Sequence, residues 1–258
     1  MLEHAALPAQ GTVSSRVAEG IADICFGHPK SNSLPASVLR SLADEIARAG
    51  ARNDVRVIVL RSYGAGAFCA GASFDELVAI RDAASGKEFF MGFARVILAI
   101  TRCRVPIVTR VHGKVVGGGV GIVAASDYAL ATENAALRLS ELAVGIGPFV
   151  VGPAIERKAG AGALSAMALD ADWRSAQWGS QHGLYARLME NLNALDSGVA
   201  SFAQRLAKSN PEALALIKRA TWSGTDDWPA LLEERASMSG RLVLSDFTKQ
   251  AIAAFASK

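Results

Sequence analysis

The sequence contains few cysteines and no run of charged residues of one sign. Its three cysteines, Cys25, Cys69 and Cys103, lie far apart among apolar neighbours. An odd number of widely spaced thiols predicts neither a disulfide framework nor a zinc site, and it fits a reducing compartment. Charged residues make up 20% of the 258 residues and hydrophobic residues 51%. This composition excludes a disordered chain, because disorder requires high charge and little apolar surface.

The sequence also lacks a basic cluster, a membrane span and a secretory signal. The net charge is only +3, and the Lys and Arg residues are scattered, so no nucleic-acid partner is predicted. The longest apolar stretch, residues 115–125, is interrupted by four glycines and is too short to cross a bilayer. Residues 1–10 have no cationic start followed by an apolar run. We expect a cytoplasmic protein without a membrane partner.

Two common nucleotide-binding motifs are missing. Gly117 and Gly119 would need a third glycine at position 122 to form a dinucleotide fingerprint, and that position is Ile122. No Gly-Lys-Ser/Thr occurs, so a P-loop is not predicted either.

Apolar periodicity in the first 140 residues predicts an α/β fold. Polar and apolar residues alternate in segments 12–17 and 21–26, which indicates a hairpin. Pro35 begins a stretch of helical periodicity that ends near Gly50. Beyond it, the patterns predict strands at 55–60, 106–111, 127–131 and 136–139, with a helix at 87–101. Such alternation is typical of parallel strands joined by helical crossovers.

The remainder of the chain is predicted to be mostly helical. Helical spacing is found in residues 151–158, 162–169, 192–208, 211–222 and 228–244. We divide the chain into a core, residues 1–195, and a C-terminal helical region, residues 196–258. The apolar faces of those helices could pack on the core, but we favour an oligomerisation surface.

Two glycine-containing turns stand where buried strands are followed by helices. They occupy residues 66–73 and 112–121. Small residues let a ligand approach the main chain, and a helix N-terminus offers N–H groups without partners. Tight helix packing would explain one such turn equally well. Two of them together could donate to a single oxygen atom.

These turns, together with residues 28–34, 125–127, 245–247 and 252–255, resemble the crotonase family, also called the enoyl-CoA hydratase/isomerase superfamily. The resemblance covers nearly the whole chain. It implies a crotonase (ClpP-like) α/β fold of repeated ββα units forming two nearly perpendicular sheets, with a C-terminal helical trimerisation region. It also implies a homotrimer or a dimer of trimers, and an acyl-CoA thioester as substrate, with no cofactor and no metal.

The resemblance assigns roles to individual residues. The family's two oxyanion-binding amides fall on Ala72 and Gly118, which would stabilise a thioester enolate, and Glu141 would transfer the proton. We expect substrate contacts from the segments around the two turns and after the first hairpin: Lys30, Ser31, Asn32, Ala70, Gly71, Gly117 and Gly121. A bulky residue or proline at Gly118 is expected to reduce turnover strongly with only a modest loss of stability.

The glutamates leave the reaction open. Hydratases of the family usually carry two, and the corresponding positions here are Gly121 and Glu141. Two carboxylates suit the addition of water, whereas one suffices to move a double bond. Asp75 or Glu76 could supply the missing acid. Hydration, including that of a methylglutaconyl-type substrate, and isomerisation both remain possible, as does a catalytically silent acyl-CoA-binding protein.

Other departures from the family pattern concern the pocket. Ser73 replaces the aspartate usual in hydratases, and residues 149–152 replace a Gly-Gly pair. Phe149, Trp173 and Trp178 add apolar bulk that could shape this pocket, but core packing explains each of them at least as well, so they are left out of the predicted site. His112 is interpreted as a turn residue, since no second metal ligand has suitable spacing. Asp127 is expected to make local hydrogen bonds.

Overall fold

The protein is described by a computed structural model that covers residues 7–256. Residues 1–6 of the N-terminal segment considered above lie outside this range. A six-stranded sheet forms the centre, in the order β1-β2-β4-β6-β8-β10. All its neighbouring strands are parallel except the β1–β2 pair. The strands are β1 (Thr12–Ala18), β2 (Ile21–Gly27), β4 (Val57–Ser62), β6 (Ile107–Val111), β8 (Tyr128–Thr132) and β10 (Arg187–Met189).

The predicted hairpin and the predicted parallel strands are confirmed. The β1–β2 turn consists of Glu19 and Gly20, which both have positive φ angles, 51° and 80°. Two such residues in succession are typical of tight hairpin turns, whose twist matches that of the strands. Strands β4 and β6 are rich in Val, Ile and Leu, as expected of parallel strands whose two faces are covered by helices.

Repeated ββα units position the glycine turns. Each of four long strands is followed by a short one: β3 (Ser33–Leu34), β5 (Gly71–Ala72), β7 (Val115–Val116) and β9 (Leu137–Arg138). The short strands pair as β3–β5 and β7–β9, and a bridge between Cys69 and Val115 links the two pairs. The helices that follow are α1 (Ala36–Ala51), α2 (Phe74–Ala79), α3 (Ala83–Arg102) and α4 (Gly118–Ala125). The second sheet therefore consists of two-stranded pieces, and it holds both turns.

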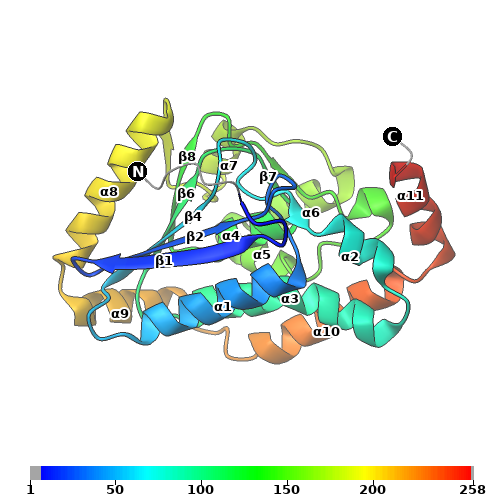
Figure 1. The fold of residues 1–258 in the computed structure, drawn as a ribbon, viewed down its shortest axis with the longest axis horizontal. Helices are drawn as coiled ribbons and strands as arrows, with labels where there is room; N and C mark the ends of the chain where they lie inside the picture. The colour runs from blue at the N-terminus through cyan, green and yellow to red at the C-terminus, as the bar shows by residue number, and fades with distance from the viewer. Residues whose placement is uncertain (1–6, 257–258) are drawn as a thin grey trace.

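Helices pack on both faces of the main sheet. Helices α1, α3 and α10 (Trp228–Leu242) run side by side along one face (Figure 1). Helix α8 (Leu192–Ala207) packs its buried residues against Val57, Val108 and Leu130 on the other face. Helices α3 and α10 approach closely because both carry glycine at the crossing: a Cβ atom on Gly86 would lie 2.8 Å from the carbonyl oxygen of Gly240.

The C-terminal third is helical, as predicted. It also contains α5 (Gly152–Ala159), α6 (Ala161–Asp170), α7 (Ala176–Gln181), α9 (Pro211–Thr221) and α11 (Asp246–Ala256). Periodicity did not predict α7, α11 or β10, which are short or near the chain end. The division proposed at residue 195 falls inside α8, and the oligomerisation role of the C-terminal helices stays a prediction. Within residues 7–256, no helix is both long and apolar enough to cross a membrane.

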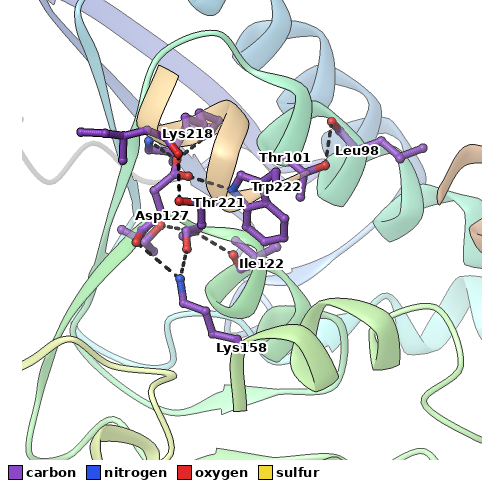
Figure 2. Close-up of polar contacts among 12 residues, drawn as sticks. Leu98, Thr101, Ile122, Asp127, Lys158, Lys218, Thr221 and Trp222 are labelled. Carbon is purple, nitrogen blue, oxygen red and sulfur yellow. Dashed lines mark hydrogen bonds and ion pairs between the residues drawn. The ribbon is translucent and has the colours of Figure 1, made fainter. Parts of the chain in front are cut away.

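A buried charge cluster joins α9 to the sheet (Figure 2). The Asp127 carboxylate accepts hydrogen bonds from the main-chain nitrogen of Ile107 (2.7 Å) and the indole nitrogen of Trp222 (2.9 Å). Lys218 Nζ lies 2.5 Å from Asp127 Oδ2. Lys158 donates to the carbonyl oxygen of Ser126 at 2.7 Å, and burial lowers the pKa of this lysine. Predicting only local hydrogen bonds for Asp127 was therefore incomplete.

Candidate active site

A cavity of about 380 Å³ lies between the two glycine turns, α3 and the segment after β9. Its polar lining groups are few and its wall is largely apolar, which is the usual character of a small-molecule site. Five phenylalanines line it: Phe74, Phe89, Phe90, Phe93 and Phe149. The cavity also brings together Ala70, Gly71, Ala72, Gly117, Gly118 and Glu141, six of the ten residues predicted for the site.

The second glycine turn places the N-terminus of α4 against the cavity. Gly118 is the first residue of this helix, so its N–H group has no intrahelical acceptor. The helix dipole favours negative charge at this end. A Cβ atom on Gly118 would lie 2.4 Å from the ring of the buried Phe93. A larger residue there must displace part of the core, so we now expect a greater loss of stability than the modest one predicted from the sequence.

The first glycine turn leads through Ala72 into α2. Strand β5 pairs with β3, and the amides on either side of this short strand, Ala70 N and Ser73 N, donate to Asn32 O and Leu34 O. The Ser33 hydroxyl donates to the carbonyl oxygen of Ala72 at 2.8 Å. These bonds fix the main chain where it meets the cavity.

Glu141 provides the carboxyl group of the cavity. It follows β9 and precedes the 3-10 turn η1 (Leu142–Val144). Although part of the residue is exposed, Oε2 is buried and has no hydrogen-bond partner among the described residues. Burial raises the pKa of Glu141 to about 7, and nearby main-chain groups of Glu141 and Ser140 only partly oppose this. A carboxyl group with such a pKa can accept and return a proton near neutral pH.

Gly117 allows the carboxyl group of Glu141 to lie against the turn. Its φ angle is +54°, a conformation that favours glycine. A Cβ atom at this position would lie 3.1 Å from Glu141 Oε1. Glycine is thus required both for the turn and for the close approach of the carboxylate.

Three predicted binding residues do not line the cavity. Asn32 is buried, and its amide group donates to the carbonyl oxygens of Tyr63 and Ala67, each at 2.9 Å. It therefore holds the first glycine turn in place. Lys30 is exposed and forms an ion pair with Asp75. Ser31 belongs to the same turn and lies between Lys30 and Asn32 in the chain. Contact of Lys30, Ser31 and Asn32 with coenzyme A stays a prediction.

The tenth predicted residue, Gly121, faces the core. A Cβ atom there would lie 2.5 Å from Val151 Cγ1 and 3.1 Å from Ile97 Cδ1. Val151 belongs to the segment that departs from the family's Gly-Gly pair, so its side chain fills space next to the position where hydratases carry glutamate. Neither proposed substitute acid lines the cavity: Asp75 pairs with Lys30, and Glu76 accepts from the amide of Ala36 at 2.8 Å.

Several cavity residues were not predicted. Phe149 and Trp173, which sequence analysis left out of the predicted site, line the cavity, while Trp178 stacks on His182 instead. Arg138, Ser140 and Ser239 add polar groups. Ser239 comes from α10, about 100 residues beyond Glu141, and periodicity alone could not have assigned it to the site. Phe89, Phe90 and Phe93 share a helix face, a pattern that core residues also show.

His112 is not among the lining residues of this cavity. Its side chain is buried with neither ring nitrogen hydrogen-bonded to a described residue, and burial lowers its pKa to about 4. The ring is therefore neutral near pH 7.

Residues 16–258 match the family model described as Enoyl-CoA hydratase/isomerase. The chain belongs to this family. With a fold of ββα units, it is a member of the crotonase superfamily.

Relatives of this enoyl-CoA hydratase/isomerase family member have several names. A Rhodobacter capsulatus protein named "Probable enoyl-CoA hydratase" is 27% identical over 254 residues, covering 96% of this chain and 95% of the relative. A Mycobacterium tuberculosis protein, "(7aS)-7a-methyl-1,5-dioxo-2,3,5,6,7,7a-hexahydro-1H-indene-carboxyl-CoA hydrolase", is 33% identical over 123 residues, covering 48% of this chain. The chain spans about half the length of this relative and of its Rhodococcus jostii counterpart.

Solved structures of the family share the fold. An enoyl-CoA hydratase from Mycobacterium avium is 26% identical with a TM-score of 0.81, and the match covers 97% of each chain. An enoyl-CoA hydratase from Bacillus halodurans gives a TM-score of 0.87 at 19% identity, covering 94% of this chain and 99% of the other. The second likeness supports the fold alone.

Proposed function

We propose that this protein isomerises enoyl-CoA thioesters by moving one proton between two carbon atoms of the acyl chain. One observation carries the proposal: Glu141 is the only carboxylate among the described residues that line the cavity. A double-bond shift needs one group that takes a proton from carbon 2 and returns it at carbon 4. Addition of water is better served by two acids, and the second position is occupied by Gly121 beside Val151.

The main-chain amides of Ala72 and Gly118 would bind the thioester oxygen. Both residues border the cavity, and the N-terminus of α4 adds a favourable dipole at Gly118. When carbon 2 loses its proton, this oxygen becomes negatively charged. Fixed N–H donors stabilise that charge without reorganising, and each is worth on the order of 3 kcal/mol in enzymes where one has been removed.

Glu141 would carry the proton between the two carbons. Its pKa of about 7 lets the carboxylate accept a proton and release it again at neutral pH. The mainly apolar cavity wall offers few groups that could hold a water molecule for addition to the double bond, which favours isomerisation over hydration. Phe93 belongs to this wall, and its ring lies 2.4 Å from the point where a Cβ atom on Gly118 would be.

A second candidate is hydrolysis of a cyclic keto-acyl-CoA. The 33% identity to the Mycobacterium tuberculosis hydrolase favours it, although the match covers only about half of either chain. Glu141 would then activate a water molecule instead of removing a proton from carbon.

The isomerase proposal is tested with 2-enoyl-CoA and 3-enoyl-CoA. We expect conjugated enoyl absorbance to appear from 3-enoyl-CoA, and Glu141→Gln to reduce this rate by about 10²- to 10⁴-fold with acyl-CoA binding retained. The exposed Glu133→Gln serves as a control and should behave like the parent.

Other outcomes would contradict the proposal. Loss of absorbance from 2-enoyl-CoA would indicate hydration, with a methylglutaconyl thioester as the branched substrate to test next. Conversion of only a cyclic keto-acyl-CoA would favour hydrolysis. A Glu141→Gln protein equal to the parent in every proton-exchange assay, with normal binding, would indicate a silent acyl-CoA-binding protein.

A further inference from the structure

A second polar atom is buried in the cavity without a partner. Ser239 lies on α10 and is 1% exposed, and it lines the same cavity as Glu141. Its Oγ atom is buried and forms no hydrogen bond with any described residue. A buried hydroxyl group without a hydrogen bond is destabilising, so this position calls for a partner from the cavity.

Another serine on the same helix, Ser237, forms a hydrogen bond within the helix that Ser239 lacks. The Ser237 hydroxyl donates to the carbonyl oxygen of Glu233, one turn earlier, at 2.9 Å. Serines inside helices commonly satisfy their hydroxyl groups in this way. Ser239 has no such bond, so its hydroxyl group remains available to a ligand.

Packing keeps Ser239 at the cavity. The next residue, Gly240, lies at the close crossing of α10 and α3, where a Cβ atom would come within 2.5 Å of the main-chain nitrogen of Lys87. The helix cannot move toward α3, and α3 also supplies Phe89, Phe90 and Phe93 to the wall. The hydroxyl group is therefore held within a mainly apolar surface.

We propose that the Ser239 hydroxyl group binds an uncharged oxygen atom, a ketone or hydroxyl group, on the acyl chain of the CoA thioester. This inference rests on the proposed function, because it takes the cavity to be the acyl site. A hydroxyl group can donate to a ketone and can also accept from an alcohol. It cannot by itself compensate the desolvation of a carboxylate, so an uncharged oxygen atom suits Ser239 better than a charged one. Ser239 is thus a specificity residue, and Glu141 acts at the thioester end.

The test uses CoA analogues that cannot be hydrolysed. S-(2-oxononyl)-CoA keeps a carbonyl group for the two amides, and a matched series carries a second ketone at carbon 6, 7 or 8. Calorimetry should show that the parent binds one member of the series about tenfold more tightly than the plain analogue, a ratio equivalent to about 1.4 kcal/mol. Ser239→Ala should bind the plain analogue as the parent does and lose the preference.

Controls separate a contact from a structural effect. Ser237→Ala, on the same helix, should keep the preference, and Ser239→Cys should retain only part of it because a thiol is a weak donor. The melting temperature of Ser239→Ala should not fall, since no protein hydrogen bond is lost.

Two results would overturn the proposal. The first is a parent that binds all analogues equally, which leaves the proposed function intact. The second is a Ser239→Ala variant that still binds one ketone analogue more tightly than the plain analogue. If Ser239→Ala does not fold, the same conclusion follows when Ser239→Cys keeps the full preference of the parent. Failure of every analogue to bind would instead reject the acyl-CoA site itself, and with it both proposals.

Discussion

The carboxyl group of Glu141 is placed where ionisation is costly. Its Oε2 atom is buried and unpaired, and the glycine at position 117 lets Oε1 approach the turn. Burial raises the pKa to about 7, whereas the same group in the unfolded chain titrates near 4.5. The folded state therefore binds a proton more tightly than the unfolded state between these two values.

This shift predicts a pH dependence for both activity and stability. The isomerisation rate at low substrate concentration should rise as pH increases through about 7, because only the ionised carboxylate can take the first proton. Ionisation of the buried group also lowers the stability of the folded protein as pH rises from about 4.5 to about 7. Glu141→Gln should be more stable than the parent at pH 8, by roughly 1–3 kcal/mol. Urea unfolding at several pH values measures this difference.

The stability advantage of Glu141→Gln should depend on pH in one direction only. The advantage of Glu141→Gln should shrink as pH falls and disappear below about 4.5, where the carboxyl group is protonated in both states. A constant advantage across pH would mean that the gain does not come from ionisation.

Gly121 and Val151 form a matched pair. The valine side chain occupies the space that a residue larger than glycine would need. Gly121→Glu alone should lose about 1–3 kcal/mol of stability through overpacking. Combining it with Val151→Gly should recover part of that loss and give measurable hydration of 2-enoyl-CoA, as denaturation and absorbance assays would show. Equal stability of the single and double variants would contradict this pairing.

At the scale of elements, the C-terminal helices are fixed by specific contacts with the core. Helix α10 contributes Ser239 to the cavity and crosses α3 at paired glycines. Helix α9 is attached to the sheet through Lys218, Trp222 and Asp127 (Figure 2), none of which lines the cavity. The predicted C-terminal region is thus continuous with the core in packing.

The contribution of the Lys218–Asp127 ion pair to the stability of the protein can be measured. The side chain of Lys218 is 3% exposed and that of Asp127 is 15% exposed, so removing the lysine leaves a largely buried carboxylate without its ion-pair partner. We expect Lys218→Met to cost about 3 kcal/mol in the free energy of unfolding. Lys87→Met, which breaks the more exposed pair with Glu233, should cost much less because solvent screens that pair. Similar losses in both variants would argue against a buried anchor.

At the scale of the whole molecule, large apolar side chains remain exposed on the C-terminal half. Leu169 is 72% exposed, Ile217 is 62% exposed and Phe247 is 70% exposed. Contiguous exposed apolar surface often marks an interface, although single residues of this kind are common. These side chains are compatible with the predicted oligomer, whose symmetry the resemblance gave as a trimer or a dimer of trimers.

Light scattering coupled to gel filtration tests the assembly. A trimer should have three times the chain mass of 27.0 kDa, and a dimer of trimers six times that mass. A mass of one chain at micromolar concentration would contradict the prediction and would leave the C-terminal helices as part of the core alone. The cellular compartment stays a prediction.

The sequence alone determined the elements and the pieces of the site that are local in the chain. Strand alternation, helix periodicity and the two glycine turns each depend on neighbouring residues, so the hairpin, α1, α3 and the turn that contains Gly117 and Gly118 could be found by pattern. The choice of Glu141 came from the resemblance to the family. Only the tertiary structure decided that Val151 fills the space beside Gly121, that Asn32 supports a turn, and that Ser239 reaches the cavity. Those facts depend on how distant segments pack, and packing has no local signature in the chain.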